Sequence, residues 1–299
     1  MSKLVECVPN ISEGRNKEII EACVNEVRSI DEVKLVDYSS DPDHNRSVIT
    51  FVGSPEKVKE AAFALTKKAA DLIDLTKHQG THKRMGAVDV IPFIPLGETT
   101  MEECIQISEE LAEKIGTELN IPVYLYANSA KRKHCVKLPT IRKGEFEGFD
   151  DKIKLSKWEP DFGPAKKHPS FGCVAVGARE FLVAFNIYLD TQDLSVATTI
   201  ANSLRESGGG LQHLQAMGMY IDEKSMVQVS MNILNFKKLP LYRLIETIRL
   251  EAARWGVSIR ETELIGLIPL QAILESFSYY TQLPGLSTDQ IIDMKIHED

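Results

Sequence analysis

A loop centred on His82 carries the residue types that proton transfer on an anionic substrate requires. His82 stands between Gly80 and Gly86, and Lys83 and Arg84 follow it directly. Two glycines so close together indicate a loop and not the interior of a helix. Histidine changes its charge near neutral pH, and two neighbouring cations attract an anion. The pattern therefore predicts acid–base chemistry here, with a solvated histidine on a surface loop as the alternative.

A zinc site is a second alternative for the same histidine. His78 and His82 are four residues apart, a spacing that zinc sites use on helices. Gly80 interrupts such a helix, and no glutamate stands where a zinc protease of this type needs one. The sequence therefore favours a site without a metal.

Composition and charge exclude several classes of partner. The chain has 299 residues and a formal net charge of -8, so it has no overall attraction for nucleic acid or an anionic membrane. Its five cysteines are scattered and form no Cys-x-x-Cys pair, which is typical of reduced thiols in a cytosolic protein. The first residues lack the apolar core of a signal peptide, and no apolar run approaches the ~20 residues of a membrane span. We therefore expect a cytoplasmic protein that binds neither nucleic acid nor a membrane.

The elements around the His82 loop follow the order of a ferredoxin-like unit, βαββαβ. Apolar residues recur at helical spacing in two segments, and short apolar runs bounded by turn formers indicate strands. The strand that begins near residue 87 is expected to end at Pro92 and Pro95, because proline lacks the N–H that a central strand needs. The expected strands are residues 4–8, 33–38, 47–52 and 87 onward, and the expected helices are residues 17–29 and 55–72.

An insertion follows this first unit. Thr100 and Glu103 form a capping box that begins a helix, and residues 123–126 are expected to form a further strand. Residues 130–156 are charged and weakly periodic, and we interpret them as surface helix and loop. Residues 158–172 contain three prolines and two glycines, which indicates an ordered loop between two halves of the chain.

The second half repeats the order βαββαβ and adds a last helix. Its expected elements are strands at residues 181–189, 217–221, 227–233 and 257–267, and helices that begin after Asp193, at Pro240 and at Pro269. The predicted fold class is therefore α/β (α+β), with two ferredoxin-like subdomains, residues 1–178 and 179–299, whose sheets are covered by helices. A cleft between two such units is the default place for a ligand.

Three segments give the chain a resemblance to a known family. Residues 5–14 read Val-Glu-Cys-Val-Pro-Asn-Ile-Ser-Glu-Gly, residues 80–96 contain the His82 loop, and residues 161–164 read Asp-Phe-Gly-Pro. Together they resemble the glutamate formiminotransferases, including the formiminotransferase part of formiminotransferase-cyclodeaminases. The similarity covers nearly the whole chain. It implies a homodimer whose chains each hold folate in a tunnel between two subdomains.

The resemblance also implies a reaction. The family moves the formimino group of N-formimino-L-glutamate to N5 of tetrahydrofolate, in histidine degradation and one-carbon metabolism. Tetrahydrofolate is then a co-substrate, and no metal is implied. The folate nitrogen attacks the formimino carbon, and glutamate leaves as an amine. One group that titrates near neutral pH can take the proton from N5 and return it to the departing nitrogen.

Two kinds of side chain follow from this chemistry. His82 matches the catalytic histidine of the family. Because the substrates carry carboxylates, which arginine forks bind well, Arg84 is the first expected carboxylate-binding residue and Arg46 the second. Arg84 is expected to belong to the catalytic group with His82 and Asp41. The alternative for each arginine is an ordinary solvated side chain.

The loop before Arg46 departs from the mammalian pattern. Ser39 stands where mammalian relatives have an aspartate thought to assist the histidine. We expect Asp41 or Asp43 to supply that carboxylate instead, by orienting His82 or stabilising its protonated form, and we expect this loop to lie near His82.

Residues 163–172 match the folate-binding segment of the family. Lys166, Lys167 and His168 replace mostly neutral residues there. They either strengthen the field for a folate polyglutamate tail or form a solvated run of charge. The expected substrate- and folate-binding residues are Asn10, Glu13, Arg46, Gly163, Pro164, Ala165, Lys166, Lys167, His168, Pro169, Ser170, Phe171, Gly172 and Asn186.

Two rival functions use the same residues. Some members of the family transfer a formyl group from 5-formyltetrahydrofolate to glutamate. Tandem ferredoxin-like units also occur in non-catalytic modules, so a folate-binding sensor is the second rival.

Overall fold

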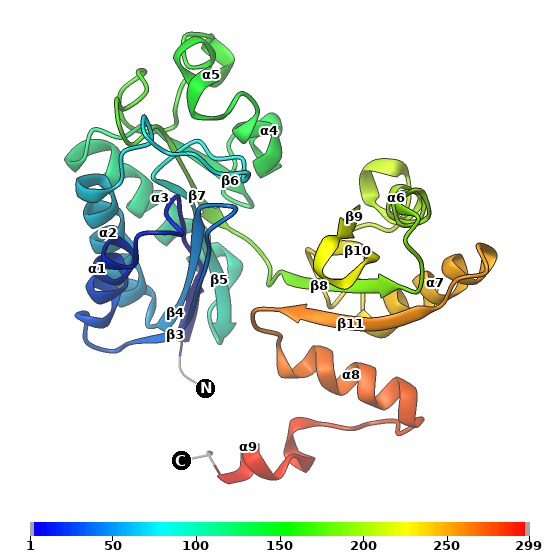
Figure 1. Cartoon of the computed structure of the whole chain (residues 1–299). Coiled ribbons are helices and arrows are strands. Elements are labelled where there is room, and N and C mark those ends of the chain that lie inside the picture. The colour runs from blue at the N-terminus through cyan, green and yellow to red at the C-terminus, as the bar shows by residue number, and fades with distance from the viewer. Residues whose placement is uncertain (1–2, 297–299) are drawn as a thin grey trace. The chain divides into compact units, whose positions relative to one another are not determined.

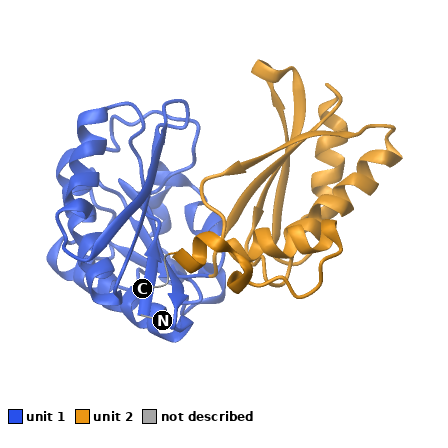
Figure 2. Cartoon of the chain, turned by 90° about the horizontal axis from the view of Figure 1, so that it is seen from below, with its two compact units in different colours: residues 1–179 blue, residues 180–299 orange. Residues whose placement is uncertain are grey.

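The computed structural model describes residues 3–296. The chain divides into two compact units at the boundary between residues 179 and 180 (Figure 2). Each unit combines one sheet with helices, so the predicted α/β class and the two βαββαβ orders are confirmed. The units are described one at a time below.

The described part of the first unit contains one seven-stranded sheet. Its strands lie in the order β3, β4, β1 with β2, β5, β7, β6, because β1 and β2 share the position between β4 and β5. The strands from β3 to β5 pair antiparallel, and β5, β7 and β6 pair parallel. The strands are β1 (Lys3–Cys7), β2 (Asn10–Ile11), β3 (Val33–Asp41), β4 (Arg46–Gly53), β5 (Val88–Gly97), β6 (Val123–Ala127) and β7 (Val174–Ala178).

Three helices cover one face of this sheet: α1 (Lys17–Arg28), α2 (Pro55–Leu72) and α3 (Met101–Glu118) (Figure 1). Their apolar faces join the strands in one buried cluster. The predicted capping box of α3 is confirmed, since Thr100 Oγ1 accepts from Glu103 N at 3.2 Å and Glu103 Oε2 accepts from Thr100 N at 2.9 Å.

Strand β5 continues through both prolines, so the predicted end at Pro92 was wrong. Val8 N donates to Pro92 O, which shows that Pro92 faces the break between β1 and β2. Arg179 N donates to Phe93 O, so Phe93 and, by alternation, Pro95 face the β7 side. The pairing with β7 ends at Phe93, and the missing N–H of Pro95 therefore has no partner to lose.

Residues 130–156 are not only surface structure, in contrast to the expectation. They form α4 (Leu138–Arg142) and α5 (Glu145–Lys152), which lie above the sheet in Figure 1. Ile141 and Phe149 are buried in one cluster with Tyr124, Tyr126 and Ala175 of β6 and β7. The segment thus covers the second face of the sheet over β6 and β7. Its many charged residues hid the few apolar residues that anchor it.

The second unit has a four-stranded antiparallel sheet within residues 180–296, in the order β11, β8, β10, β9. Val196 of α6 and Leu244 of α7 join its inward residues in a second buried cluster. Among the described residues, the structure has no helix long and apolar enough to cross a membrane. The elements are β8 (Val183–Leu189), α6 (Leu194–Leu204), β9 (Leu214–Ile221), β10 (Met226–Ile233), α7 (Leu241–Arg254), β11 (Ile259–Ile265), α8 (Leu270–Thr281) and α9 (Ile292–Ile296).

Candidate functional site

His82 lies in the loop between α2 and β5, as predicted. A side chain at Gly80 would put a Cβ atom 2.3 Å from the carbonyl oxygen of His44, so glycine allows the two loops to touch. Thr81 N donates to Asp43 O at 3.1 Å. The prediction that the loop before Arg46 lies near His82 is therefore confirmed.

The imidazole of His82 contacts the guanidinium of Arg46, with Nε2 and NH1 2.9 Å apart. Arginine can only donate, so His82 Nε2 is the acceptor and the proton of the neutral ring is on Nδ1. Both side chains are half-buried. The nitrogen that would accept a proton from a substrate is thus occupied by Arg46 in this structure.

The surroundings of His82 oppose its protonation. Burial lowers its pKa to about 3, and the positive charges of Arg46 and Arg142 act in the same direction. Burial also lowers the pKa of Arg46, with Arg142 as a second cause. His82 is therefore neutral at physiological pH and is available as a base once its Nε2 atom is free.

Arg142 and Asp89 form a buried ion pair beside this site. Asp89 is 1% exposed, and its Oδ2 accepts from Arg142 Nε at 2.7 Å. Its Oδ1 accepts from Met85 N at 2.8 Å, which ties the pair to the His82 loop. Sequence reasoning missed both residues. An aspartate within the otherwise apolar strand β5 was the available signal, because a buried carboxylate needs a partner.

Asp41 contacts His44, and His44 contacts His82. Its Oδ2 is 2.6 Å from His44 Nδ1, and its Oδ1 accepts from the backbone N–H groups of Asp43 and His44. Burial acts to raise the pKa of Asp41, but these hydrogen bonds from His44 prevail and lower it. The His44 ring in turn meets the His82 ring edge to face, with centroids 6.3 Å apart. The expected carboxylate is thus near the site, with His44 between it and His82, and Ser39 is exposed on β3.

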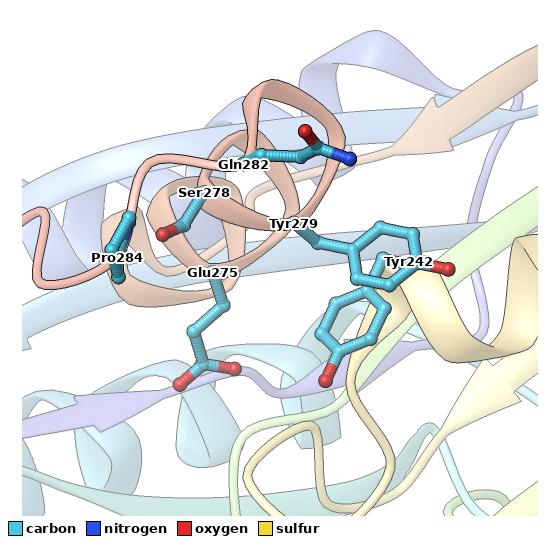
Figure 3. A pocket seen from close by; sticks show the side chains of 6 residues that line it. All are labelled: Tyr242, Glu275, Ser278, Tyr279, Gln282 and Pro284. Carbon is cyan, nitrogen blue, oxygen red and sulfur yellow. The ribbon is translucent and has the colours of Figure 1, made fainter.

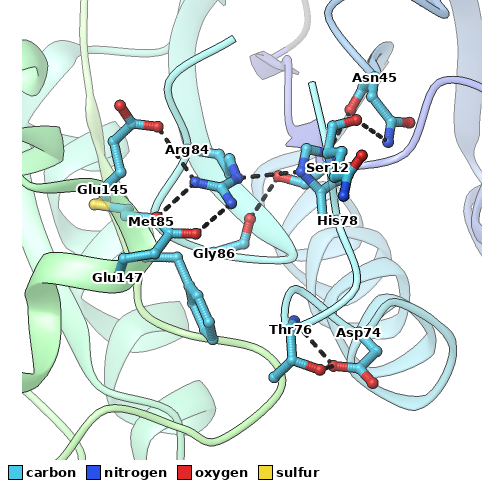
Figure 4. Close-up of polar contacts among 12 residues, drawn as sticks. Ser12, Asn45, Asp74, Thr76, His78, Arg84, Met85, Gly86, Glu145 and Glu147 are labelled. Carbon is cyan, nitrogen blue, oxygen red and sulfur yellow. Dashed lines mark hydrogen bonds and ion pairs between the residues drawn. The ribbon is translucent and has the colours of Figure 1, made fainter. Parts of the chain in front are cut away.

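Arg84 is buried and holds the loop together (Figure 4). Its NH1 and NH2 groups donate to the carboxylate of Glu147 at 2.9 and 2.6 Å, and NH1 also donates to Glu145. Its Nε donates to His78 Nδ1, and His78 Nε2 is 2.9 Å from Asn45 O. The predicted carboxylate fork is therefore formed with the protein's own carboxylates, and both nitrogens of His78 are occupied. Residues 3–296 contain no group of three His, Cys, Asp or Glu side chains placed to hold a metal ion.

The N-terminal motif supports the two loops from the side. Asn10 Nδ2 donates to Val8 O, and Glu13 Oε1 accepts from the N–H groups of Arg15 and Asn16 before α1. Ser12 Oγ donates to Gly86 O at 2.8 Å. The Ser12 contact places this motif beside the His82 loop, and the role of Asn10 and Glu13 as ligand contacts stays a prediction.

Residues 163–172 pack against the far side of the His82 loop. Gly86 and Gly172 form a β-bridge, and Ala87 N donates to Phe171 O at 2.8 Å. A side chain at Gly172, whose φ is +85°, would meet Met85 O at 2.1 Å. The expected folate-binding segment and His82 thus belong to one assembly in the first unit. Pro164, Ala165 and Pro169 are exposed, whereas Ser170 O accepts from Leu75 N.

The two lysines of this segment have different surroundings. Lys167 donates to Asp150 at 2.7 Å and lies 3.9 Å above the ring of Phe146. Lys166 is exposed. Burial lowers the pKa of His168, whose Nδ1 accepts from Phe171 N. Of the three, Lys166 is the most exposed, whereas Lys167 and His168 are half-buried.

Asn186 belongs to the second unit. It lies on β8, on the face opposite the buried cluster, and its Nδ2 donates to Glu263 Oε2 at 3.1 Å. Its predicted contact with a ligand stays a prediction. A surface hollow of the same unit is lined by Tyr242, Glu275, Ser278, Tyr279, Gln282 and Pro284, with the rings of Tyr242 and Tyr279 stacked at 4.3 Å (Figure 3). None of the predicted site residues lines it.

Glu6 is a buried carboxyl group that sequence reasoning did not single out. It is 5% exposed on β1, and its burial raises its pKa to about 7, against the opposing charge of Arg179. Its position among the apolar residues of β1 offered the same signal as that of Asp89 in β5.

We expect Glu6→Gln to stabilise the protein at alkaline pH. The folded protein keeps the Glu6 proton to about pH 7, whereas the unfolded chain releases it near pH 4.5. Folding stability from this group therefore falls as pH rises between these values and stays lower above them. The neutral variant should gain about 1–3 kcal/mol in free energy of unfolding at pH 8 and almost nothing at pH 4. Denaturant unfolding at both pH values measures this, and an equal gain at both would contradict it.

Known proteins match both units of the chain. Residues 4–179 match the N-terminal subdomain of the formiminotransferase domain, and residues 184–298 match the formiminotransferase domain. A glutamate formimidoyltransferase of Streptococcus pyogenes is 48% identical over 95% of both chains. One of Thermoplasma acidophilum is 44% identical over 99% of this chain and 98% of its own. The formimidoyltransferase-cyclodeaminase of Mus musculus is 43% identical, and the match spans 53% of its length.

Proposed function

The chain belongs to the formiminotransferase family, and from this premise we propose that it transfers the formimino group of N-formimino-L-glutamate to N5 of tetrahydrofolate. The products are 5-formiminotetrahydrofolate and glutamate. Tetrahydrofolate is a co-substrate in this proposal, and the reaction belongs to histidine degradation and one-carbon metabolism. Membership of the family also leads us to propose a cytoplasmic homodimer.

The neutral, half-buried imidazole of His82 is the observation that carries the proposed mechanism. When N5 attacks the formimino carbon, N5 must lose a proton, and the departing glutamate nitrogen must gain one. A neutral imidazole accepts the first proton at Nε2 and returns it to the leaving nitrogen, so no net proton is lost. Arg46 beside it offers a positive charge for a substrate carboxylate.

A coupled assay tests the proposal with the purified protein. Formiminoglutamate and tetrahydrofolate are mixed, and glutamate release is followed. A parallel reaction with 5-formyltetrahydrofolate and glutamate measures formyl transfer, which is the alternative activity. Glutamate release in the first reaction is the expected result, and folded protein that binds folate without any release would contradict it and favour a binding module.

Lys166→Glu is expected to weaken the binding of polyglutamylated folate more than the binding of folate with one glutamate. An exposed cation on a protein of net charge -8 adds a local attraction for the extra carboxylates of the longer tail. The additional loss should be about fivefold in Kd, which is about 1 kcal/mol. Fluorescence titration with both folates measures it, and Lys167→Glu, which breaks the Asp150 contact, is the matched comparison. Equal weakening for both folates would show that Lys166 is only a solvated charge.

A further inference from the structure

We propose that a substrate carboxylate activates His82 by drawing the guanidinium of Arg46 away from its Nε2 atom. Arg46 is then a positioning residue that occupies the basic nitrogen of His82 and releases it when an anion binds. This inference rests on the proposed function, because it concerns the same histidine, and its test below does not depend on turnover.

The contact between Arg46 and His82 is the first support. Arg46 begins β4 and is paired with Asp41 at the turn end of the β3–β4 hairpin, so its side chain projects from a fixed backbone position. Its NH1 group lies 2.9 Å from Nε2 of His82. A lone pair that accepts from a guanidinium cannot accept a substrate proton at the same time. While this contact is made, Nε2 of His82 cannot act as a base.

The lack of a carboxylate partner for Arg46 is the second support. Arg142 is paired with Asp89, and Arg84 with Glu145 and Glu147. Within residues 3–296, no ion pair joins the side chain of Arg46 to a carboxylate. A carboxylate is a stronger partner for a guanidinium than a neutral imidazole, because the hydrogen bonds are charge-assisted and can be bidentate. An arriving carboxylate therefore exchanges the Arg46–His82 contact for a better one.

The charges around His82 determine the direction of the effect. Arg46 on β4, Arg142 on α4, His44 on the β3–β4 loop and His78 on its own loop all disfavour a positive charge on His82. A bound carboxylate neutralises Arg46 and adds a negative charge nearby, while Asp89 continues to neutralise Arg142. Binding of the anion should therefore raise the pKa of His82, and the proton that it takes comes from solvent or from N5 of the folate.

Nuclear magnetic resonance of the Cε1–H group of His82 tests this without any turnover. The signal is assigned by its loss in His82→Asn, and its pH titration is recorded for the free protein and with each of two probes. Glutarate represents the formiminoglutamate end, and p-aminobenzoylglutamate represents the tail of folate. We expect at least one probe to move the pKa of His82 into the range of about 5 to 7. The probe that does so identifies the source of the carboxylate. Neutral glutaramide should leave the titration unchanged.

Substitution of Arg46 separates this role from a structural one. In Arg46→Gln, His82 should titrate at higher pH than in the wild type even without a probe, and neither probe should move it further. Lys77→Gln, which changes an exposed lysine of the same loop, should respond as the wild type does. An unchanged His82 titration with bound probe, a full response in Arg46→Gln, or failure of both probes to bind would each overturn the inference. Group transfer without a probe-dependent shift would leave the proposed function intact, whereas a shift without transfer would refute only that function.

Discussion

His82→Ala is expected to lower kcat for formimino transfer by about a hundred- to ten-thousand-fold while the Kd for folate stays within a few fold. The imidazole is the group that can move the proton between N5 and the departing nitrogen. The surfaces that we expect to hold folate, residues 163–172, keep their contacts to residues 85–87 in this variant. Binding and chemistry should therefore separate.

Steady-state kinetics and folate titration of the same preparation measure both quantities. His134→Gln is the matched control, because His134 contacts Lys157 O and the ring of Trp158 in a different part of the first unit. It should retain wild-type turnover. A parallel loss of folate binding and turnover in His82→Ala would identify His82 as a binding or structural residue.

Asp89→Ala is expected to destabilise the protein by about 3–5 kcal/mol. It leaves the guanidinium of Arg142 without its buried counter-charge and Met85 N without its acceptor. Because Met85 belongs to the His82 loop, turnover should fall as well. Denaturant unfolding near neutral pH gives the free energy of unfolding.

Two comparisons make the Asp89 result specific. The double variant Asp89→Leu with Arg142→Met removes both charges and should recover part of the lost stability. Lys57→Ala breaks the exposed Lys57–Glu60 pair and should leave stability unchanged within error. If Asp89→Ala is as stable as the wild type, the buried pair does not hold this part of the fold.

The order of elements was predictable because each half of the chain has clear local signals. These signals depend only on residues close together in sequence. Examples are the cap at Thr100, the apolar periodicity of the helices and the alternation in β8 and β10. The continuation of β5 through Pro92 was not predictable, because it depends on the break between β1 and β2, which is far from Pro92 in the sequence. The anchoring of residues 130–156 likewise depends on a few buried side chains in a charged segment.

The parts of the site that lie in a sequence motif were predictable. The parts that depend on contacts between residues far apart in sequence were not. The His82 loop and its contact with the loop before Arg46 were correctly predicted. The carboxylates that hold Arg84 come from Glu145 and Glu147, which are 61 and 63 residues away in sequence. The interposition of His44 between Asp41 and His82 depends on side-chain geometry that spacing alone does not define.

The central claim is that this protein moves a formimino carbon to tetrahydrofolate with His82 as proton carrier. The direct measurement follows that carbon, by mixing ¹³C-formimino-labelled formiminoglutamate with tetrahydrofolate and the wild-type protein or His82→Ala. In the wild type, the ¹³C signal should move from glutamate to N5 of folate with one equivalent of free glutamate, and His82→Ala should leave the label on glutamate over the same time. Label that stays on glutamate with the wild type, or that is transferred equally fast by His82→Ala, would contradict the claim.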